Sequence, residues 1–174
     1  MGDFGYRLRQ FWRNVSARPL PTAAQAEIAA HLTPAELALF QRFSSSDQWH
    51  SYRVLKTLQA AGHDQPDLWT AALLHDVGKT RAPLSVWERS WVVLGQMVCP
   101  RKTAVWGQGQ AVGWRRPFVV KAQHPAWGAE MAAAVGSRPL AVELIRRHQD
   151  NGLVTAVTET DHLLRHLQWA DDQN

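Results

Sequence analysis

Apolar residues along this chain follow the spacing of amphipathic helices, and strand signals do not recur. Thr33-Pro34-Ala35-Glu36 combines an N-cap, a proline at the first helical position and a capping-box glutamate, so it predicts a helix through Phe43. Ser46-Asp47 predicts the start of the next helix, which Gly62 ends. The pattern indicates an all-α fold.

The middle of the chain continues this pattern and then loses it. Pro66 opens a run that is apolar nearly all round up to Leu74, which is typical of a helix at the centre of a core. A second capping box at Ser85-Val86-Trp87-Glu88 predicts a helix to about Val98. Residues 100–120 follow neither period, so we expect an irregular excursion or short helices there.

Helix signals return in the C-terminal part of the chain. His124-Pro125 places a histidine at the cap and a proline at the first turn of a predicted helix that Gly136 closes. The later signals predict a helix from about Pro139 to His148, a turn at Asn151-Gly152, and a last helix capped by Thr158 and running to Asp171.

Size and composition fit one globular domain, with 174 residues of which 45% are hydrophobic and 20% charged. We expect a single-domain helical bundle in which N-terminal helices (residues 1–45) pack on a domain spanning residues 46–174. The Trp- and Arg-rich stretch at about residues 80–122 is expected to be an insertion in that domain.

Charge and cysteine content indicate where the protein is located and what kind of substrate suits it. The charged start Met1-Gly2-Asp3-Phe4-Gly5-Tyr6-Arg7 does not resemble a secretory signal, and no window approaches the roughly twenty apolar residues of a transmembrane helix. Cys99 has no cysteine to pair with, so we expect a soluble, cytoplasmic protein. The net charge of +4 comes from scattered basic residues, which suits a small anionic substrate better than a nucleic-acid duplex.

Candidate chemistry centres on Leu73-Leu74-His75-Asp76-Val77-Gly78-Lys79, where an imidazole and a carboxylate follow an apolar helical run. Burying such groups is costly unless something binds them, and a metal ion suits both. The alternative is that His75 ends the helix and Asp76 caps the next loop. Two side chains cannot enclose a cation, so further ligands must come from elsewhere. The candidates are His50, His124, His148 and Asp171.

In this order, a histidine, the His-Asp pair, two further histidines and an aspartate resemble the signature of the HD-domain superfamily of metal-dependent phosphohydrolases, over residues 47–171. The resemblance implies an HD-type helical bundle that holds two metals bridged by the Asp76 carboxylate, as in the binuclear branch. Asp172 competes with Asp171 for the last place, but the family's Ala-Asp pattern favours Asp171. The implied ligand sets are His50, His75, Asp76 and Asp171 for one metal, and Asp76, His124 and His148 for the other.

Imidazoles with a few carboxylates suit transition metals better than calcium or magnesium, so we expect iron or manganese, with cobalt, nickel or zinc as alternatives. Two such metals would share a hydroxide that attacks phosphorus, which predicts cleavage of a phosphoester, nucleotide-like in character. Asp76 and Lys79 are the expected catalytic residues. Lys79 lies one helical turn beyond His75, where it can steady the hydroxide or a phosphate oxygen.

Other polar residues are candidates for supporting roles. Asp47 shares a helix face with His50 and can orient that imidazole, or it can simply favour the helix N-terminus. Arg115, Arg116 and Arg147 are candidates for binding phosphate. The Trp- and Arg-rich segment can cover the site and meet a base or a membrane surface, or its aromatic residues can only pack an extra helix onto the bundle.

Two other functions fit the same residues. The six ligands can hold a mixed-valent di-iron centre that activates oxygen, as in the inositol and phosphonate oxygenases of this superfamily. The domain can also be a metal-binding regulatory module without turnover. The stretch after His148 lacks the Gly-Tyr-Pro end of the HD-GYP signature, so cleavage of cyclic dinucleotides is not implied.

Overall fold

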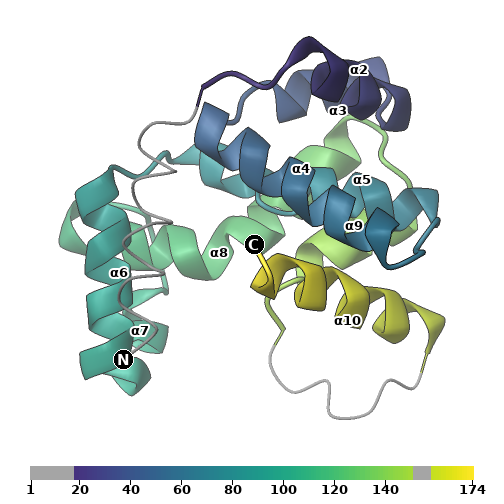
Figure 1. The fold of residues 1–174 in the computed structure, drawn as a ribbon. Helices are drawn as coiled ribbons and strands as arrows, with labels where there is room; N and C mark the ends of the chain where they lie inside the picture. The colour runs from purple at the N-terminus through teal and green to yellow at the C-terminus, as the bar shows by residue number, and fades with distance from the viewer. Residues whose placement is uncertain (1–17, 151–157) are drawn as a thin grey trace, which may run out of the picture.

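The computed structural model describes residues 18–150 and 158–174, and these residues form helices and no strand. A central group of packed helices consists of α4 (Ser45–Ala60), α5 (Pro66–Leu74), α9 (Pro139–Arg147) and α10 (Glu159–Asp172) (Figure 1). α2 (Thr22–His31) and α3 (Pro34–Phe40) lie over one end of this group. α8 (Arg116–Ala134) connects it to α6 (Val86–Val98) and α7 (Pro100–Trp106), and the short 3₁₀ helices are η1 (Val77–Arg81) and η2 (Gly113–Arg115). The all-α prediction is confirmed.

One hydrophobic core joins these helices. Its fully buried side chains include Leu58 of α4, Leu73 of α5, Ile145 of α9 and Leu167 of α10. Ile28 of α2 lies in the same cluster, so the N-terminal helices share the core. The shared core supports the single-domain organisation, which stays a prediction.

Side-chain caps set the helix starts largely where the sequence signals predict them. The capping boxes at Thr33, Ser85 and Thr158 are all formed. α4 begins earlier than predicted, because the Ser44 hydroxyl accepts a hydrogen bond from the Asp47 backbone amide and makes Ser44 the N-cap. α3 ends at Phe40 rather than Phe43. The predicted Asn151-Gly152 turn and the N-terminal stretch tested for a secretory signal lie outside the described residues.

The predicted helix start at His124 is wrong. His124 lies in the middle of α8, and Pro125 lies inside that helix. Proline has no backbone N–H, which suits the first turn of a helix, where that N–H would have no partner within the helix. The dipeptide therefore resembles a helix start when only the local sequence is considered. The apolar residues before it, Phe118, Val119 and Val120, are buried and hold the continuous helix in place.

Gly78 allows η1 to lie directly on α8. A Cβ at Gly78 would lie 2.0 Å from the His124 carbonyl oxygen and 2.7 Å from the Gly128 amide nitrogen. Only a glycine therefore permits this approach. Because Asp76 comes two residues earlier, the same contact brings its carboxylate to His124.

The Trp- and Arg-rich segment at about residues 80–122 contains α6 and α7, which pack on each other and on α8. We refer to this segment as the insertion, although its status as an insertion stays a prediction. Figure 1 shows this pair standing apart from the central helices. Trp87 of α6 is 85% exposed and Trp91 is 53% exposed, so these rings do not fill a core. Contact with a membrane surface stays a prediction. Among the described helices, none combines the length and apolar character needed to cross a membrane.

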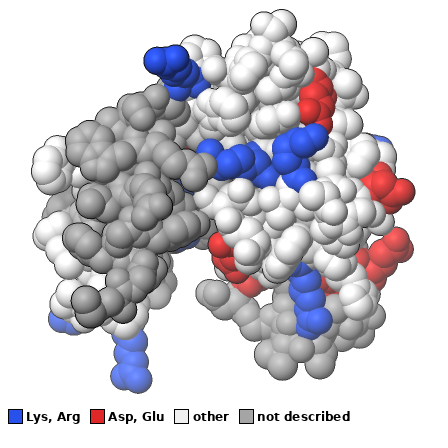
Figure 2. All heavy atoms as spheres, viewed as in Figure 1, with Lys and Arg blue, Asp and Glu red and all other residues white. Residues whose placement is uncertain are grey.

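Basic side chains do not form one continuous area on the face that Figure 2 shows. On the face shown in Figure 2, Lys and Arg lie in separate groups among Asp and Glu rather than in one continuous basic surface.

We predict that Gly78→Ala lowers the free energy of unfolding by more than about 3 kcal/mol, because its Cβ would meet backbone atoms that cannot rotate away. Gly128→Ala is the matched comparison. Its Cβ would lie 3.2 Å from the Gly78 amide nitrogen and 3.2 Å from Ile145 Cγ2, so the expected loss is only about 1 kcal/mol. Urea denaturation followed by circular dichroism measures both losses. Equal losses would contradict the close contact between η1 and α8.

Candidate metal centre

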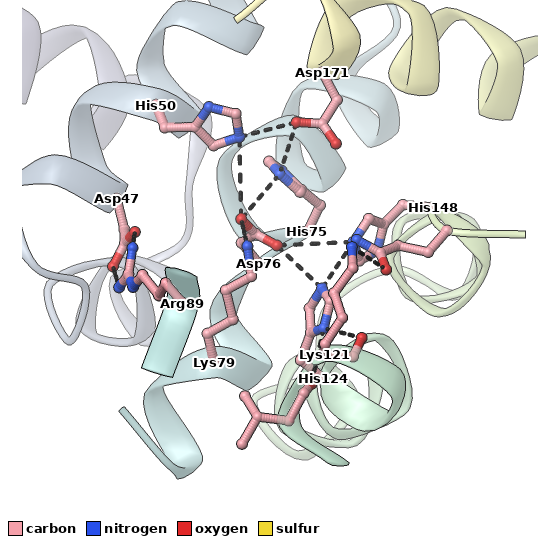
Figure 3. Close-up of polar contacts among 12 residues, drawn as sticks. Asp47, His50, His75, Asp76, Lys79, Arg89, Lys121, His124, His148 and Asp171 are labelled. Atoms are coloured by element: carbon pink, nitrogen blue, oxygen red, sulfur yellow. Dashed lines mark hydrogen bonds and ion pairs between the residues drawn. The ribbon is translucent and has the colours of Figure 1, made fainter. Parts of the chain in front are cut away.

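Six buried or half-buried polar side chains from different helices meet at one place in the bundle (Figure 3). Most of them stand at helix ends, where the chain turns toward the same region. They are His50 in α4, His75 and Asp76 at the junction of α5 and η1, His124 in α8, His148 at the end of α9, and Asp171 in the last turn of α10.

The six side chains form two groups of three. In the first, Asp171 Oδ1 lies 2.9 Å from His50 Nε2 and 3.6 Å from His75 Nε2. Two ligand atoms each about 2.1 Å from one ion and at a right angle to each other are about 3 Å apart. The spacing of this group therefore matches that of ligands around a single cation.

Asp76 belongs to the second group and also faces the first. Its Oδ1 lies 3.2 Å from His124 Nε2 and 3.8 Å from His148 Nε2. Its Oδ2 lies 3.6 Å from His75 Nε2 and 4.0 Å from His50 Nε2. Each oxygen of one carboxylate is thus directed at a different pair of imidazoles (Figure 3).

Backbone carbonyls fix the orientation of the imidazoles. His75 Nδ1 lies 2.9 Å from the Ala72 carbonyl oxygen, and His148 Nδ1 lies 2.7 Å from that of Ile145. A carbonyl oxygen only accepts, so Nδ1 carries the proton and donates it. The lone pair of each neutral ring is consequently on Nε2, which points to the centre of the site.

Pro125 contributes to the orientation of His124. Because proline has no backbone N–H, the Lys121 carbonyl loses the partner it would have in a regular helix. His124 Nδ1 lies 3.0 Å from that carbonyl oxygen and 3.1 Å from the Val120 carbonyl oxygen. The ring therefore donates to a carbonyl that the proline leaves free, and its Nε2 faces Asp76.

These donors fit a cation. His75 Nε2 is buried without a hydrogen-bond partner, and the Nε2 atoms of His124 and His148 lie 3.2 Å apart although both Nδ1 atoms hold the protons. Nitrogen lone pairs that are buried this close together without a hydrogen-bond donor are costly unless a positive charge lies between them. Nitrogen and carboxylate donors in this mixture suit a divalent transition metal.

Electrostatics favours positive charge at the same place. Burial would raise the pKa of Asp76, but Lys79 and His75 hold that pKa well below its usual range. Burial would lower the pKa of His75, yet the carboxylates of Asp76 and Asp171 outweigh it and raise the pKa to about 9. The two carboxylates thus attract a positive charge beside His75, which a bound metal can supply in place of a proton.

The other two imidazoles are held neutral. Burial lowers the pKa of His124, and burial together with the nearby His75 lowers the pKa of His148 to about 3. A neutral imidazole is the form that binds a metal. This pair is therefore ready to bind a cation at neutral pH without first losing a proton.

Lys79 lies at the site, but in a different local structure from the expected α-helix. The sequence placed it one α-helical turn beyond His75, but α5 ends at Leu74 and the chain continues as the 3₁₀ helix η1. Lys79 Nζ donates to Asp76 Oδ2 at 2.5 Å. The lysine consequently contacts the carboxylate directly.

Asp47 makes other contacts than the expected one with His50. Its carboxylate accepts from Arg89 Nη1 and Nη2 at 3.1 and 3.2 Å and from the Ser44 hydroxyl at 2.7 Å. Figure 3 shows the Asp47–Arg89 pair set apart from the six candidate ligands. Asp47 therefore joins α4 to α6 and does not orient the His50 ring in this structure.

The three arginines expected to bind phosphate are engaged elsewhere. Arg116 pairs with Glu88 and donates to a backbone carbonyl, and Arg115 lies over the Trp114 ring. Arg147 donates to Asp161 at 2.9 Å and to an aspartate two residues after His148. None of the three is among the described residues that line the cavity beside the metal centre.

Lys121 is a residue of this region that sequence reasoning missed. A cavity of about 720 Å³ adjoins the centre at His148 and Asp171, and Lys121 lines it. Lys121 Nζ donates to Gln149 Oε1 at 2.9 Å, and burial lowers the pKa of this lysine. The signal was its position one helical turn before His124, but the predicted helix began only at His124.

Comparison with protein families matches the HD domain model to residues 49–172, most of the chain. The chain belongs to the HD domain family. This family consists mostly of metal-dependent hydrolases, in agreement with the fold and with the His and Asp groups described above. Searches of curated proteins and of solved structures gave no match.

We predict that Asp171→Asn lowers the bound metal by about one ion per chain, because the amide removes a charged ligand from the group of His50 and His75. Asp172→Asn is the matched control, since Asp172 is exposed on the next residue and belongs to neither group. Metal analysis after dialysis measures the difference. Loss of metal in Asp172→Asn but not in Asp171→Asn would show that Asp172, and not Asp171, is the ligand.

Proposed function

We propose that this HD domain protein is a phosphohydrolase that cleaves a nucleotide-like phosphoester with two divalent transition metals. Iron and manganese are the leading candidates, with cobalt, nickel or zinc as alternatives. The observation that carries the proposal is the position of Asp76, whose two oxygens face separate groups of imidazoles. A carboxylate in this arrangement is suited to joining two cations.

The proposed roles of the side chains follow from their contacts. Asp171 would hold one metal together with its two neighbouring imidazoles, and Asp76 would contribute to both groups of ligands. When bound, the metals would activate water and stabilise negative charge on a phosphate. The proposed ligands are His50, His75, Asp76 and Asp171 for one metal, and Asp76, His124 and His148 for the other.

Lys79 is proposed to act with Asp76 in catalysis. Its ammonium group contacts Asp76 Oδ2 and keeps this carboxylate ionised despite burial. The side chain is still 35% exposed, so it also places a positive charge where an anionic group can approach. The first effect favours binding of a metal by Asp76, and the second favours binding of an anionic phosphoester.

An iron-dependent oxygenase would use the same donors, and so would a regulatory module that binds metal without turnover. Phosphoester hydrolysis is favoured because two lysines lie in this region: Lys79 contacts Asp76, and Lys121, whose pKa is lowered by burial and further by Lys79, lines the adjoining cavity. Such a concentration of positive charge beside a metal centre suits a substrate with more than one negative charge. Oxygen uptake by the iron-loaded protein without phosphate release would instead support the oxygenase.

We predict that the wild-type protein binds about two metal ions per chain and that His124→Ala binds about one, because the variant loses a ligand of the second group only. His162→Ala is the control, since His162 is an exposed histidine of α10 outside both groups. Metal analysis of protein purified with added manganese or iron measures the ratio. A wild-type content of at most one ion would contradict the second metal.

We predict that the metal-loaded protein releases phosphate or alcohol from one or more members of a panel of phosphomonoesters and phosphodiesters. Asp76→Ala should lower the rate on the order of 1,000-fold or more, because both metals lose their shared ligand. Asp64→Ala, an exposed aspartate in the loop before α5, should keep the wild-type rate. Substantial activity in folded Asp76→Ala would rule out the bridging role.

A further inference from the structure

The cavity beside the metal centre has two different ends. At its inner end it reaches His148 and Asp171, with Lys121 at the boundary. Away from the centre, the wall formed by α6, α7 and the first half of α8 carries Val92, Ala104 and Phe118 beside Gln96 and Thr103. The residues of α10 that line the cavity are polar and include Arg165 and Gln168. A ligand in this cavity would therefore meet candidate metal ligands at the inner end and, farther out, the apolar side chains of Val92, Ala104 and Phe118 on one side, which we call the apolar wall.

Close packing fixes the apolar wall against α8. A Cβ at Gly95 would lie 2.6 Å from Phe118 Cε1, so the backbone of α6 rests directly on this ring. The Phe118 ring is also 5.0 Å from the Trp106 ring of α7, at an interplanar angle of 65°. Two ion pairs also fix α6: Arg89 pairs with Asp47 of α4, and Glu88 pairs with Arg116 at the start of α8.

The size of the cavity exceeds what a phosphate group needs. Its volume of about 720 Å³ is within the range of roughly 300–1,000 Å³ that is typical of sites for whole small molecules. A phosphate held by the metal centre would occupy only the inner end. The remaining space is bounded by the apolar wall on one side and by polar side chains of α10 elsewhere. An apolar or aromatic group covalently attached to that phosphate would bury its surface against the apolar wall.

Lys121 lies at the junction of the two ends. It projects from α8 one helical turn before the candidate ligand His124, and it lines the cavity together with His148. Its hydrogen bond to Gln149 Oε1 fixes the ammonium group on this side of the cavity.

We propose that the insertion forms a substrate subsite for the apolar or aromatic organic group of a phosphoester, and that Lys121 binds the phosphate where this subsite meets the metal centre. This inference rests on the proposed function and specifies its substrate class. Arg115, Arg116 and Arg147 have no part in this subsite, since their side chains are engaged elsewhere.

Two phosphonates that the protein cannot hydrolyse test the subsite by binding alone. Phenylphosphonate and methylphosphonate carry the same anionic group and differ in the attached organic group. Calorimetric titration of the manganese-loaded protein should give about tenfold or more tighter binding of phenylphosphonate, because only the phenyl ring buries apolar area against the insertion. Equal affinity for the two phosphonates would overturn the subsite.

Ala104→Trp and Val105→Trp provide a matched pair of variants. Both positions are exposed on α7, but only Ala104 lines the cavity. Ala104→Trp should fill the outer cavity and abolish the preference for phenylphosphonate, while methylphosphonate binds as before. Val105→Trp should keep the wild-type preference. The same preference in both variants would contradict the location of the subsite.

Lys121→Met tests the phosphate contact, with Lys102→Met as control because Lys102 is an exposed lysine of α7 that does not line the cavity. Lys121→Met should weaken both phosphonates about tenfold or more while metal content and melting temperature stay unchanged. Wild-type affinity in this variant would remove Lys121 from the site.

Failure of the subsite and failure of the proposed function give different results. If phenylphosphonate is preferred and Ala104→Trp removes the preference, the subsite stands even when no phosphoester in the panel is cleaved. Hydrolysis of the panel at rates independent of the organic group, with Ala104→Trp as active as wild type on every member, would keep the proposed function and overturn the subsite.

Discussion

The arrangement of the structure depends on one buried carboxylate. Asp76 is almost fully buried, which alone would favour its neutral form, yet Lys79 and the surrounding imidazoles keep it ionised. These partners come from separate helices, so the charge is stabilised only when those helices are correctly packed. The contact of Gly78 with α8 is the backbone condition for this, because it sets the distance between Asp76 and His124.

The core and the candidate metal centre are parts of the same packing arrangement. α5 and α9 bury apolar side chains along their length and end in His75 and His148, whose Nδ1 atoms donate to carbonyls of their own last turns. The ends of core helices thus serve as rigid supports for the imidazoles. α10 is held in a similar way, since the Asn174 side chain donates to Thr57 of α4 and to a carbonyl in its own last turn.

The insertion has a different relation to the centre from the one its composition indicated. Its arginines were expected to bind phosphate, but Arg89 and Arg116 pair with carboxylates and fix α6 in place. Lys121, on the core side of the cavity, is the residue that we propose to bind the phosphate in the subsite. Ion pairs and aromatic packing therefore position the wall formed by α6 and α7, while the proposed phosphate contact comes from α8.

The sequence by itself determined the helical fold, most helix starts, the HD family and the six candidate ligands. These follow from local information: capping boxes such as Thr33–Glu36 lie within one turn, and the ordered His and Asp residues are recognisable without knowing where they meet. Only the tertiary structure decided the continuous path of α8 through Pro125, the 3₁₀ turn carrying Lys79, the partners of Asp47 and the arginines, and the position of Lys121. Each of these depends on contacts between residues distant in sequence, and the free energy of such contacts outweighs local helix signals.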